Sequence, residues 1–291
     1  MTDQTRDIPA FINASAGSAD DARTALSGDG AFDVREIAPT ELAGAIARAV
    51  ADGSTRILVA GGDGTIGTAA SALLETTGEL AILPGGTLNH FATDLGIPSE
   101  PAEALALAKS GRARPADAGL VNDRVFLNTS SVGAYVHFVR VREYLEPRFG
   151  YRIASALAAF RILFQLRLLA VELEVDGLRR SYRTPVVFIG VGERELQLPT
   201  LGNRVPDGKR GLHVMVVRGR SAGRLLAIAL NAVARGVKTV ARTPELDSFI
   251  VDRCTIMVRS QTTIAVDGEL VSLGTPLEYH LERDAFQVVC P

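Results

Sequence analysis

The residues with the clearest chemical potential form a glycine-rich block, Gly61-Gly62-Asp63-Gly64-Thr65, directly after the apolar run Arg56–Ala60. Glycines let the backbone approach a ligand closely, and a loop that opens a helix directs N–H groups at an anion. The block therefore favours phosphate binding, with Asp63 placed to organise a metal–phosphate group. A tight strand-to-helix turn is the alternative interpretation of the same glycines.

A second glycine loop, Pro84-Gly85-Gly86-Thr87-Leu88-Asn89, follows another short apolar run, Leu80–Leu83. The carboxyl ends of parallel strands meet at one edge of a sheet, so we expect both loops to line one crevice. Two loops suit a polyphosphate better than a single phosphate, and Thr87 and Asn89 can hydrogen-bond a nucleotide. Alternatively, Thr87 and Asn89 only cap the following helix.

Two familiar nucleotide motifs do not account for these loops. Gly62-x-Gly64-x-x-Gly67 has the form of the dinucleotide fingerprint, but the next strand ends in Pro84-Gly85-Gly86 without an acid for the ribose. The pattern GxxxxGK[ST] does not occur in the chain, which excludes a P-loop.

A further acidic pair lies in Asp267-Gly268-Glu269, which separates two apolar runs and predicts a two-residue hairpin turn. Phosphoryl transfer to an alcohol benefits from a carboxylate that orients or deprotonates the hydroxyl. Asp267 and Glu269 are both candidates for that base, and the sequence does not choose between them. A hairpin that serves only as a turn is the alternative.

The elements that would position these residues follow two patterns. Up to about residue 115, apolar strands alternate with helical segments, which favours a parallel sheet covered by helices. The strands expected there are 10–12, 32–37, 56–60 and 80–83, and the helices are 41–51 with Thr40 as N-cap, about 66–74, and 102–110. The later residues favour an antiparallel sheet. Its expected strands are 124–129, 168–175, 184–191, 211–217, 252–258, 262–266, 277–281 and 286–289, with helices at 144–169 and 222–241.

The composition narrows the function further. The chain has 291 residues, 47% of them hydrophobic and 22% charged, as in folded globular proteins. A net charge of −2 gives no basic field for nucleic acid, so we expect no nucleic-acid partner. The two cysteines, Cys254 and Cys290, are too few for a disulfide framework and favour a reducing cytoplasm. A signal peptide and a membrane span are not expected either.

The ordered set of motifs resembles the catalytic family of diacylglycerol and sphingosine kinases, of the bacterial lipid kinase type. Ile12–Gly17 is similar to the family's first loop, Asn-Pro-x-Ser-Gly, and the two glycine loops match GGDGT and PGGTLNHFATDLGIP. The resemblance continues through Phe126–Gly133 and ends at Val266–Glu269. It spans nearly the whole chain.

This resemblance implies an α/β nucleotide-binding domain of the NAD-kinase/diacylglycerol-kinase type over residues 1–115, to which about 279–291 return. It implies a C-terminal antiparallel β-sandwich over 116–278 that takes the lipid, with the site between the domains. Mg-ATP would be the donor and a lipid alcohol, diacylglycerol-like or sphingoid, the acceptor. The implied nucleotide ligands are Asn13, Ser15, Gly17, Gly61, Gly62, Asp63, Gly64, Thr65, Gly86, Thr87 and Asn89. Asp63 and Asp207 are the implied Mg²⁺ ligands, and the catalytic residues are Asp63, Asp267 and Glu269.

The sequence also departs from the family. Ala14 replaces the usual proline of the first loop, Ile66-Gly67-Thr68 stands where many relatives have an Asn-Glu pair, and His90 replaces an aspartate. The loop Asn203–Lys209, which in relatives often carries a structural magnesium on two acids, keeps only Asp207.

The stretch Arg148–Ala170 is apolar, with four arginines and no acid. Such a stretch suits contact with an anionic membrane surface, or packing between domains with the arginines extended to solvent. We therefore expect a cytoplasmic protein that binds membranes peripherally, and the sequence leaves a homodimer open. The competing functions are a non-catalytic lipid- or nucleotide-binding protein of the same fold and, with less support from the motifs, an NAD kinase.

Overall fold

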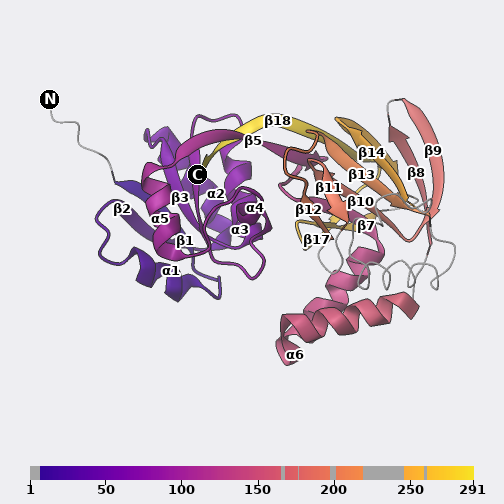
Figure 1. The fold of residues 1–291 in the computed structure, drawn as a ribbon, viewed down its shortest axis with the longest axis horizontal. Coiled ribbons are helices and arrows are strands. Elements are labelled where there is room, and N and C mark those ends of the chain that lie inside the picture. The colour runs from indigo at the N-terminus through magenta and orange to yellow at the C-terminus, as the bar shows by residue number, and fades with distance from the viewer. Residues whose placement is uncertain (1–6, 165–167, 176, 197–200, 219–245, 259–260) are drawn as a thin grey trace. The chain divides into compact units, whose positions relative to one another are not determined.

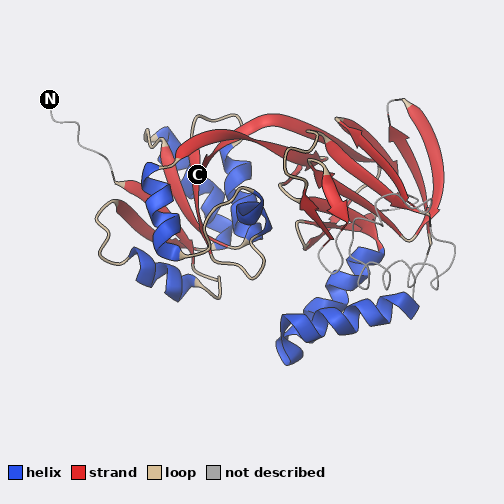
Figure 2. Ribbon diagram, viewed as in Figure 1, coloured by secondary structure: helices blue, strands red, loops and turns tan. Residues whose placement is uncertain are grey.

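The computed structural model describes residues 7–164, 168–175, 177–196, 201–218, 246–258 and 261–291. The chain divides into two compact units (Figure 1). Unit 1 comprises Met1–Ala118 and Glu282–Pro291, and unit 2 comprises Gly119–Leu281. Helices and strands alternate in unit 1, whereas strands dominate unit 2 (Figure 2). The predicted combination of an α/β domain with an antiparallel β domain is confirmed.

Unit 1 is built on a parallel sheet with the strand order β2-β1-β3-β4-β18. The strands are β1 (Ile8–Asn13), β2 (Phe32–Ile37), β3 (Arg56–Gly61), β4 (Glu79–Pro84) and the end of β18 (Leu277–Cys290). The helices are α1 (Ala19–Leu26), α2 (Pro39–Ala51), α3 (Asp63–Leu73), α4 (His90–Asp94) and α5 (Pro101–Ser110). Small and branched apolar side chains from both element types, such as Ala10, Leu58 and Leu105, share one buried core.

Two helices of unit 1 begin earlier than the sequence predicted. The N-cap of α2 is Ala38 instead of Thr40, because Pro39 occupies the first helical position, where its fixed φ and missing N–H carry no penalty. Helix α3 begins at Asp63 and not near Ile66. Asp63-Gly64-Thr65 of the glycine block therefore belongs to the first turn of a helix, whose first N–H groups have no partner within the helix.

Two larger sheets contribute strands to unit 2. One is the ten-stranded sheet that also contains β1 to β4, and its antiparallel part includes β5 (Arg112–Val121), β6 (Arg124–Phe126), β8 (Leu169–Val175), β9 (Leu178–Thr184), β15 (Arg253–Met257) and the start of β18. The other is formed by β7 (Thr129–Gly133), β10 (Val186–Val191), β13 (Leu212–Val217), β14 (Leu246–Val251), β16 (Thr262–Val266) and β17 (Glu269–Leu273). A small hairpin joins β11 (Arg194–Leu196) to β12 (Leu201–Arg204).

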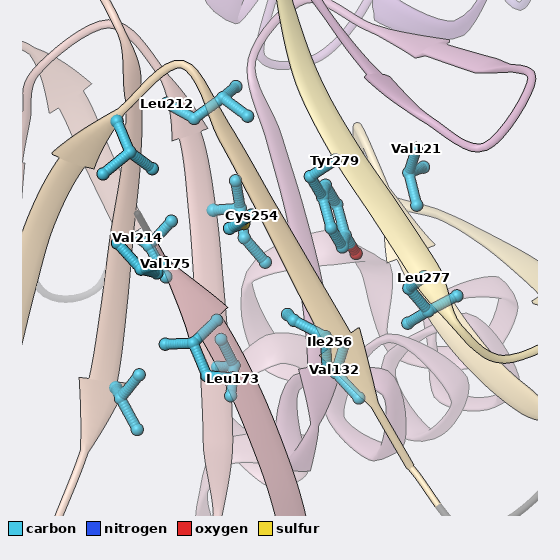
Figure 3. Close-up of a cluster of buried hydrophobic side chains, with 14 of the residues drawn as sticks. Val121, Val132, Leu173, Val175, Leu212, Val214, Cys254, Ile256, Leu277 and Tyr279 are labelled. Atoms are coloured by element: carbon cyan, nitrogen blue, oxygen red, sulfur yellow. The ribbon is translucent and has the colours of Figure 1, made fainter. Parts of the chain in front are cut away.

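The core of unit 2 lies between these two sheets (Figure 3). Leu173, Ile256 and Tyr279 come from one sheet, and Val132 and Val214 come from the other. Inward-facing side chains from two sheets that share one core define a β-sandwich.

Several boundaries in unit 2 correct the prediction. The segment 124–129 is divided between β6 and β7, and the two strands expected at 277–281 and 286–289 are one strand, β18. Strands β5, β9, β11, β12 and β14 were not predicted, whereas β17 is the second strand of the predicted Asp267-Gly268 hairpin. The helix expected at 144–169 is α6 (Ala134–Phe164), which is interrupted at Gly150. The helix expected at 222–241 lies outside the described residues.

Helix α6 changes direction at Gly150, whose φ of 71° and ψ of 163° are not helical. Pro147, just before it, cannot donate the hydrogen bond that would continue the first segment. No helix within the described ranges combines the length and hydropathy required to cross a bilayer.

Candidate functional site

The strand register of unit 1 brings the three predicted nucleotide loops to one edge of the sheet. Ile12 of β1 pairs with Ala60 of β3, and Gly61 of β3 pairs with Pro84 of β4. Each strand therefore ends at the same level, and the loop that follows each strand begins beside its neighbours. This is the arrangement that the spacing of the glycine motifs predicted.

Three loops meet at this edge: the first follows β1, the second is the glycine block after β3, and the third follows β4. Asn13 connects the first loop to the second. Its Nδ2 donates a hydrogen bond of 2.8 Å to Thr65 Oγ1, and its Oδ1 accepts one of 2.9 Å from the N–H of Ser15. Asn13, Ser15 and Thr65, three of the predicted nucleotide ligands, are thus brought together. In the structure, however, the Asn13 amide and the Thr65 hydroxyl already bond each other.

The glycines at this edge allow two loops to touch. A Cβ added to Gly86 would lie 2.7 Å from Gly62 Cα, and one added to Gly62 would lie 3.1 Å from Gly86 Cα. A Cβ on Gly61 would lie 2.7 Å from the Thr65 side chain. These three glycines are needed for close approach, whereas a Cβ on Gly17 would meet nothing within 4 Å.

Two residues that sequence reasoning did not select also hold the site. The hydroxyl of Ser18 donates a hydrogen bond of 2.6 Å to the carbonyl of Gly85, and a Cβ on Gly85 would lie 2.4 Å from that hydroxyl oxygen. The N–H of Gly85 donates to the carbonyl of Gly61 at 2.9 Å. The signal for Gly85 was its place in the Pro-Gly-Gly run, whereas nothing in the sequence points to Ser18.

The third loop is stabilised by Asn89. Its backbone is left-handed, with φ of 48°, and its side chain both accepts from the N–H and donates to the carbonyl of Gly86, each at 2.8 Å. The amide of Asn89 therefore holds the loop from within. Thr87, by contrast, is exposed at the surface of the same loop.

Asp63 is partly exposed in the first turn of α3, and its Oδ1 accepts a hydrogen bond of 3.3 Å from the N–H of Phe91. Its carboxylate thus links the second and third loops, and the positive end of α3 lies beside it. Mg²⁺ is commonly held by one or two carboxylates together with substrate phosphate oxygens. Asp63 and the glycine loops fit Mg-ATP in this sense, as a single acid beside backbone donors.

The other predicted metal ligand lies in unit 2. Asp207 is exposed in a turn, with φ of 56°, beside the hairpin of β11 and β12. Within the part of the chain that the structure describes, no three His, Cys, Asp or Glu residues gather into a metal-binding group. Asp207 therefore does not belong to a group of three such ligands there, although Glu193 accepts a hydrogen bond from the N–H of Lys209 in the same loop.

The Asp267-Gly268 turn is the predicted two-residue hairpin. Val266 pairs with Glu269 across it, and both turn residues have positive φ, 46° and 88°. Asp and Gly tolerate that backbone, and the turn matches the twist of the strands.

The two acids of this hairpin have different surroundings. Asp267 Oδ2 accepts from the N–H of Leu127 at 2.7 Å, and Oδ1 accepts from the N–H groups of Asn128 and Thr129 at 2.9 and 2.8 Å. Three backbone N–H groups therefore fix the position of this carboxylate. Glu269 is exposed and forms a 3.6 Å ion pair with Arg124.

A family of catalytic domains and several curated proteins match part of the chain. Residues 10–121 match the diacylglycerol kinase catalytic domain. The chain is 49% identical over 90 residues to the Pseudomonas aeruginosa (strain UCBPP-PA14) protein named "Probable lipid kinase YegS-like", which covers 30% of each chain. It is 38% identical over 125 residues to the diacylglycerol kinase of Bacillus subtilis (strain 168), covering 42% of this chain and 41% of that protein. Both alignments span less than half of the relative's length.

The fold as a whole is also found among solved structures. A crystal structure described as a diacylglycerol kinase from Bacillus anthracis str. Sterne superposes with a TM-score of 0.72 and 21% identity, covering 98% of this chain and 97% of that one. At this identity the likeness shows the fold alone. The resemblance predicted from the motifs is thus confirmed over residues 10–121, which match the diacylglycerol kinase catalytic domain.

Proposed function

We propose that the protein is an ATP-dependent lipid kinase that transfers the γ-phosphoryl group of ATP to the hydroxyl of a lipid, diacylglycerol-like or sphingoid. The observation that supports this most is the edge of the unit 1 sheet, where three glycine loops are fastened together beside Asp63. We propose a lipid as the acceptor because the similar proteins are named lipid kinase and diacylglycerol kinase.

In this proposal the first turn of α3 binds phosphate oxygens through its backbone N–H groups. Asn13, Ser18 and Asn89 keep the loops in place before the nucleotide arrives, so little ordering remains to be done on binding. Bound Mg²⁺ would neutralise charge on the phosphates. Asp63 orients that metal while its contact with the N–H of Phe91 fixes the carboxylate.

We assign the acceptor side to the Asp267–Glu269 hairpin, with Glu269 as the general base. Asp267 already accepts three backbone hydrogen bonds, so protonating it would cost those interactions. Among the described residues, the carboxylate of Glu269 forms a long, solvent-screened ion pair with Arg124, which leaves lone pairs of the carboxylate available. The rigid hairpin then positions Glu269, and Asp267 supports it.

The test is transfer of label from [γ-³²P]ATP to lipids in mixed micelles containing diacylglycerol, sphingosine, ceramide, phosphatidylglycerol or a polyprenol. We expect Mg²⁺-dependent labelling of at least one lipid. Asp63→Asn keeps an oxygen for the N–H of Phe91 but removes the charge, and should lower turnover by more than about 100-fold. If ATP binds and no lipid is labelled, the protein is a non-catalytic binder; if NAD is labelled instead, it is an NAD kinase.

A further inference from the structure

Strand β2 lies at the end of the unit 1 sheet (Figure 1). Within the described ranges, β2 pairs with β1 alone. The carbonyl oxygen of Ala31 accepts a hydrogen bond of 2.8 Å from the N–H of Ile8. The carbonyl oxygen of Ile37 accepts one of 3.0 Å from the N–H of Ala14. The odd-numbered residues of this stretch therefore direct their backbone groups toward β1.

The even-numbered residues of β2 direct their backbone groups away from β1, because a strand alternates with a period of two. These residues are Phe32, Val34 and Glu36. The N–H of Phe32 donates to the carbonyl of Asp29 at 3.3 Å. The edge thus offers the N–H groups of Val34 and Glu36, together with the carbonyl oxygens of all three residues. A row of outward-directed donors and acceptors is a template for another strand.

The charged side chains next to Val34 are arranged symmetrically about it. Asp33 comes before Val34 and Arg35 follows it, so both lie on one face of the strand, where they form an ion pair. The side chain of Asp33 is 44% exposed and that of Arg35 is 60% exposed. Val34 lies on the opposite face and is 38% exposed. A half-turn of the strand about Val34 therefore exchanges the position of the acid with that of the base.

We propose that β2 is a homodimer interface, in which the β2 strands of two copies pair antiparallel about a twofold axis at Val34. The two valines then form a hydrogen-bonded pair, in which each N–H donates to the carbonyl of the other copy. Each Glu36 N–H donates to the carbonyl of Phe32 in the other copy. Each Asp33 lies opposite an Arg35, at the short distance of a non-hydrogen-bonded pair.

The charges select this register over the other symmetric ones. The centre of an antiparallel pair of identical strands must be a residue whose backbone groups face outward, which leaves Phe32, Val34 and Glu36. A centre at Glu36 places two carboxylates opposite each other, and like charges in that position destabilise a sheet. A centre at Phe32 pairs the strand with the turn that precedes it. The centre at Val34 opposes charges of unlike sign and covers the exposed valines with each other.

This interface goes beyond the proposed phosphoryl transfer. The nucleotide is assigned to the loops that follow β1, β3 and β4, whereas the dimer uses the edge of β2. Pairing through β2 joins the sheets of two copies into one and removes an open edge from each. It also gives a physical form to the homodimer that the sequence leaves open.

The first test is sedimentation velocity of the full chain over a range of concentrations, without nucleotide or lipid. We expect a monomer–dimer equilibrium with a Kd in the micromolar range, because the edge of one short strand makes a small interface. Asp33→Arg and Arg35→Asp each place like charges opposite each other twice in the dimer. Each substitution should weaken dimerisation at least about tenfold. Arg183→Asp makes the same charge change as Arg35→Asp on the edge strand β9 and should dimerise like wild type.

Recombination of the charges tests the register itself. The double variant Asp33→Arg with Arg35→Asp restores opposite charges and should recover the wild-type Kd within about threefold. A mixture of the two single variants should form a heterodimer, because one variant presents two basic side chains and the other presents two acidic ones.

The backbone contribution is tested at Val34. Val34→Pro removes the N–H that faces the open side and leaves the bonds to β1 in place, which an edge strand tolerates. This variant should remain monomeric. Val34→Thr is the matched control, because it keeps the N–H and a branched side chain, and it should dimerise within about threefold of wild type.

Three results would overturn the proposal: a wild-type monomer at every concentration, a dimer that folded Val34→Pro leaves intact, or a double charge variant that folds and does not recover the dimer. A thermal melt of each variant identifies loss of folding. If Val34→Pro is unfolded, the charge variants decide, since both side chains are well exposed. Sedimentation needs neither ATP nor lipid, so the dimer can be found where lipid phosphorylation fails, and the reverse.

Discussion

At the scale of single residues, polar side chains of this protein act mainly by fastening loops. In unit 1, Asn13 and Ser18 each connect one loop of the sheet edge to another. In unit 2, Asp267 binds three consecutive backbone N–H groups. Some residues that the sequence predicts as ligands or catalytic groups therefore also hold the loops of the site in place. Substitutions can distinguish these two roles.

Asp267 and Glu269 of the hairpin allow the supporting role and the catalytic role to be tested separately. Asp267→Asn replaces one carboxylate oxygen by an NH₂ that faces a backbone donor, so we expect a loss of about 2 kcal/mol in the free energy of unfolding. Glu269→Gln changes an exposed side chain and should alter stability by less than about 0.5 kcal/mol. Urea unfolding of the two variants measures both changes.

Catalytic activity should be far more sensitive than stability to the substitution of Glu269. On the lipid that the panel identifies, we expect Glu269→Gln to lower kcat by more than about 100-fold with nucleotide affinity nearly unchanged. Arg124→Gln is the matched control, because it removes only the ion pair. Full activity of Glu269→Gln would exclude Glu269 as the base, and a selective loss in Asp267→Asn without loss of stability would assign that role to Asp267.

At the scale of elements, the buried strands β3 and β4 extend the predicted runs by one residue or two, because apolar runs that end in glycine or proline leave little choice. Strand β2 has the predicted bounds, although Phe32 is its one buried residue. The sequence Leu178–Thr184 was missed, since only Tyr182 and Thr184 are buried in β9 and its other side chains are polar or exposed.

The sequence predicted two strands in place of β18 for a related reason. Its middle residues, Glu282–Asp284, are exposed and charged, which is typical of a loop. Asp284 has φ of 52°, and its N–H donates to the buried carboxylate of Asp117 at 3.0 Å. A partner distant in sequence thus holds a backbone that local propensity disfavours.

One buried titratable group links several elements and predicts a pH dependence. His213 of β13 accepts a hydrogen bond at Nδ1 from the N–H of Arg194 in β11, and its Nε2 lies 2.7 Å from Ser248 Oγ in β14. Burial lowers the pKa of His213 below its usual value of 6.5, partly offset by Glu193.

The unfolded chain therefore binds more protons than the folded one between that lowered pKa and 6.5. Stability from His213 is complete above about pH 6.5 and is lost as the pH falls toward the folded pKa. Urea unfolding across about pH 5–8 should show this decline. In His213→Asn, stability should be lower at neutral pH but vary less with pH, whereas exposed His137→Asn should keep the wild-type profile.

At the scale of the whole molecule, the division into an α/β unit and a β-sandwich could be predicted because the hydrophobic period changes along the chain. The participation of the last residues in the first unit follows from β18, which pairs with β15 at Cys254 and with β4 at Leu80. The sequence could predict which loops share an edge of a parallel sheet. It could not predict which side chains fasten them, because those contacts join residues as far apart as Ser18 and Gly85.

We expect the fastened loops of unit 1 to bind Mg-ATP, and a thermal shift of the full chain tests this binding most directly. Ligand at 100 times its Kd adds about 2.7 kcal/mol of stability, which corresponds to a rise of about 5–10 °C in Tm. We predict that rise with Mg-ATP, and a much smaller one for Asp63→Asn. An unchanged Tm at millimolar Mg-ATP, with and without lipid micelles, would contradict the account.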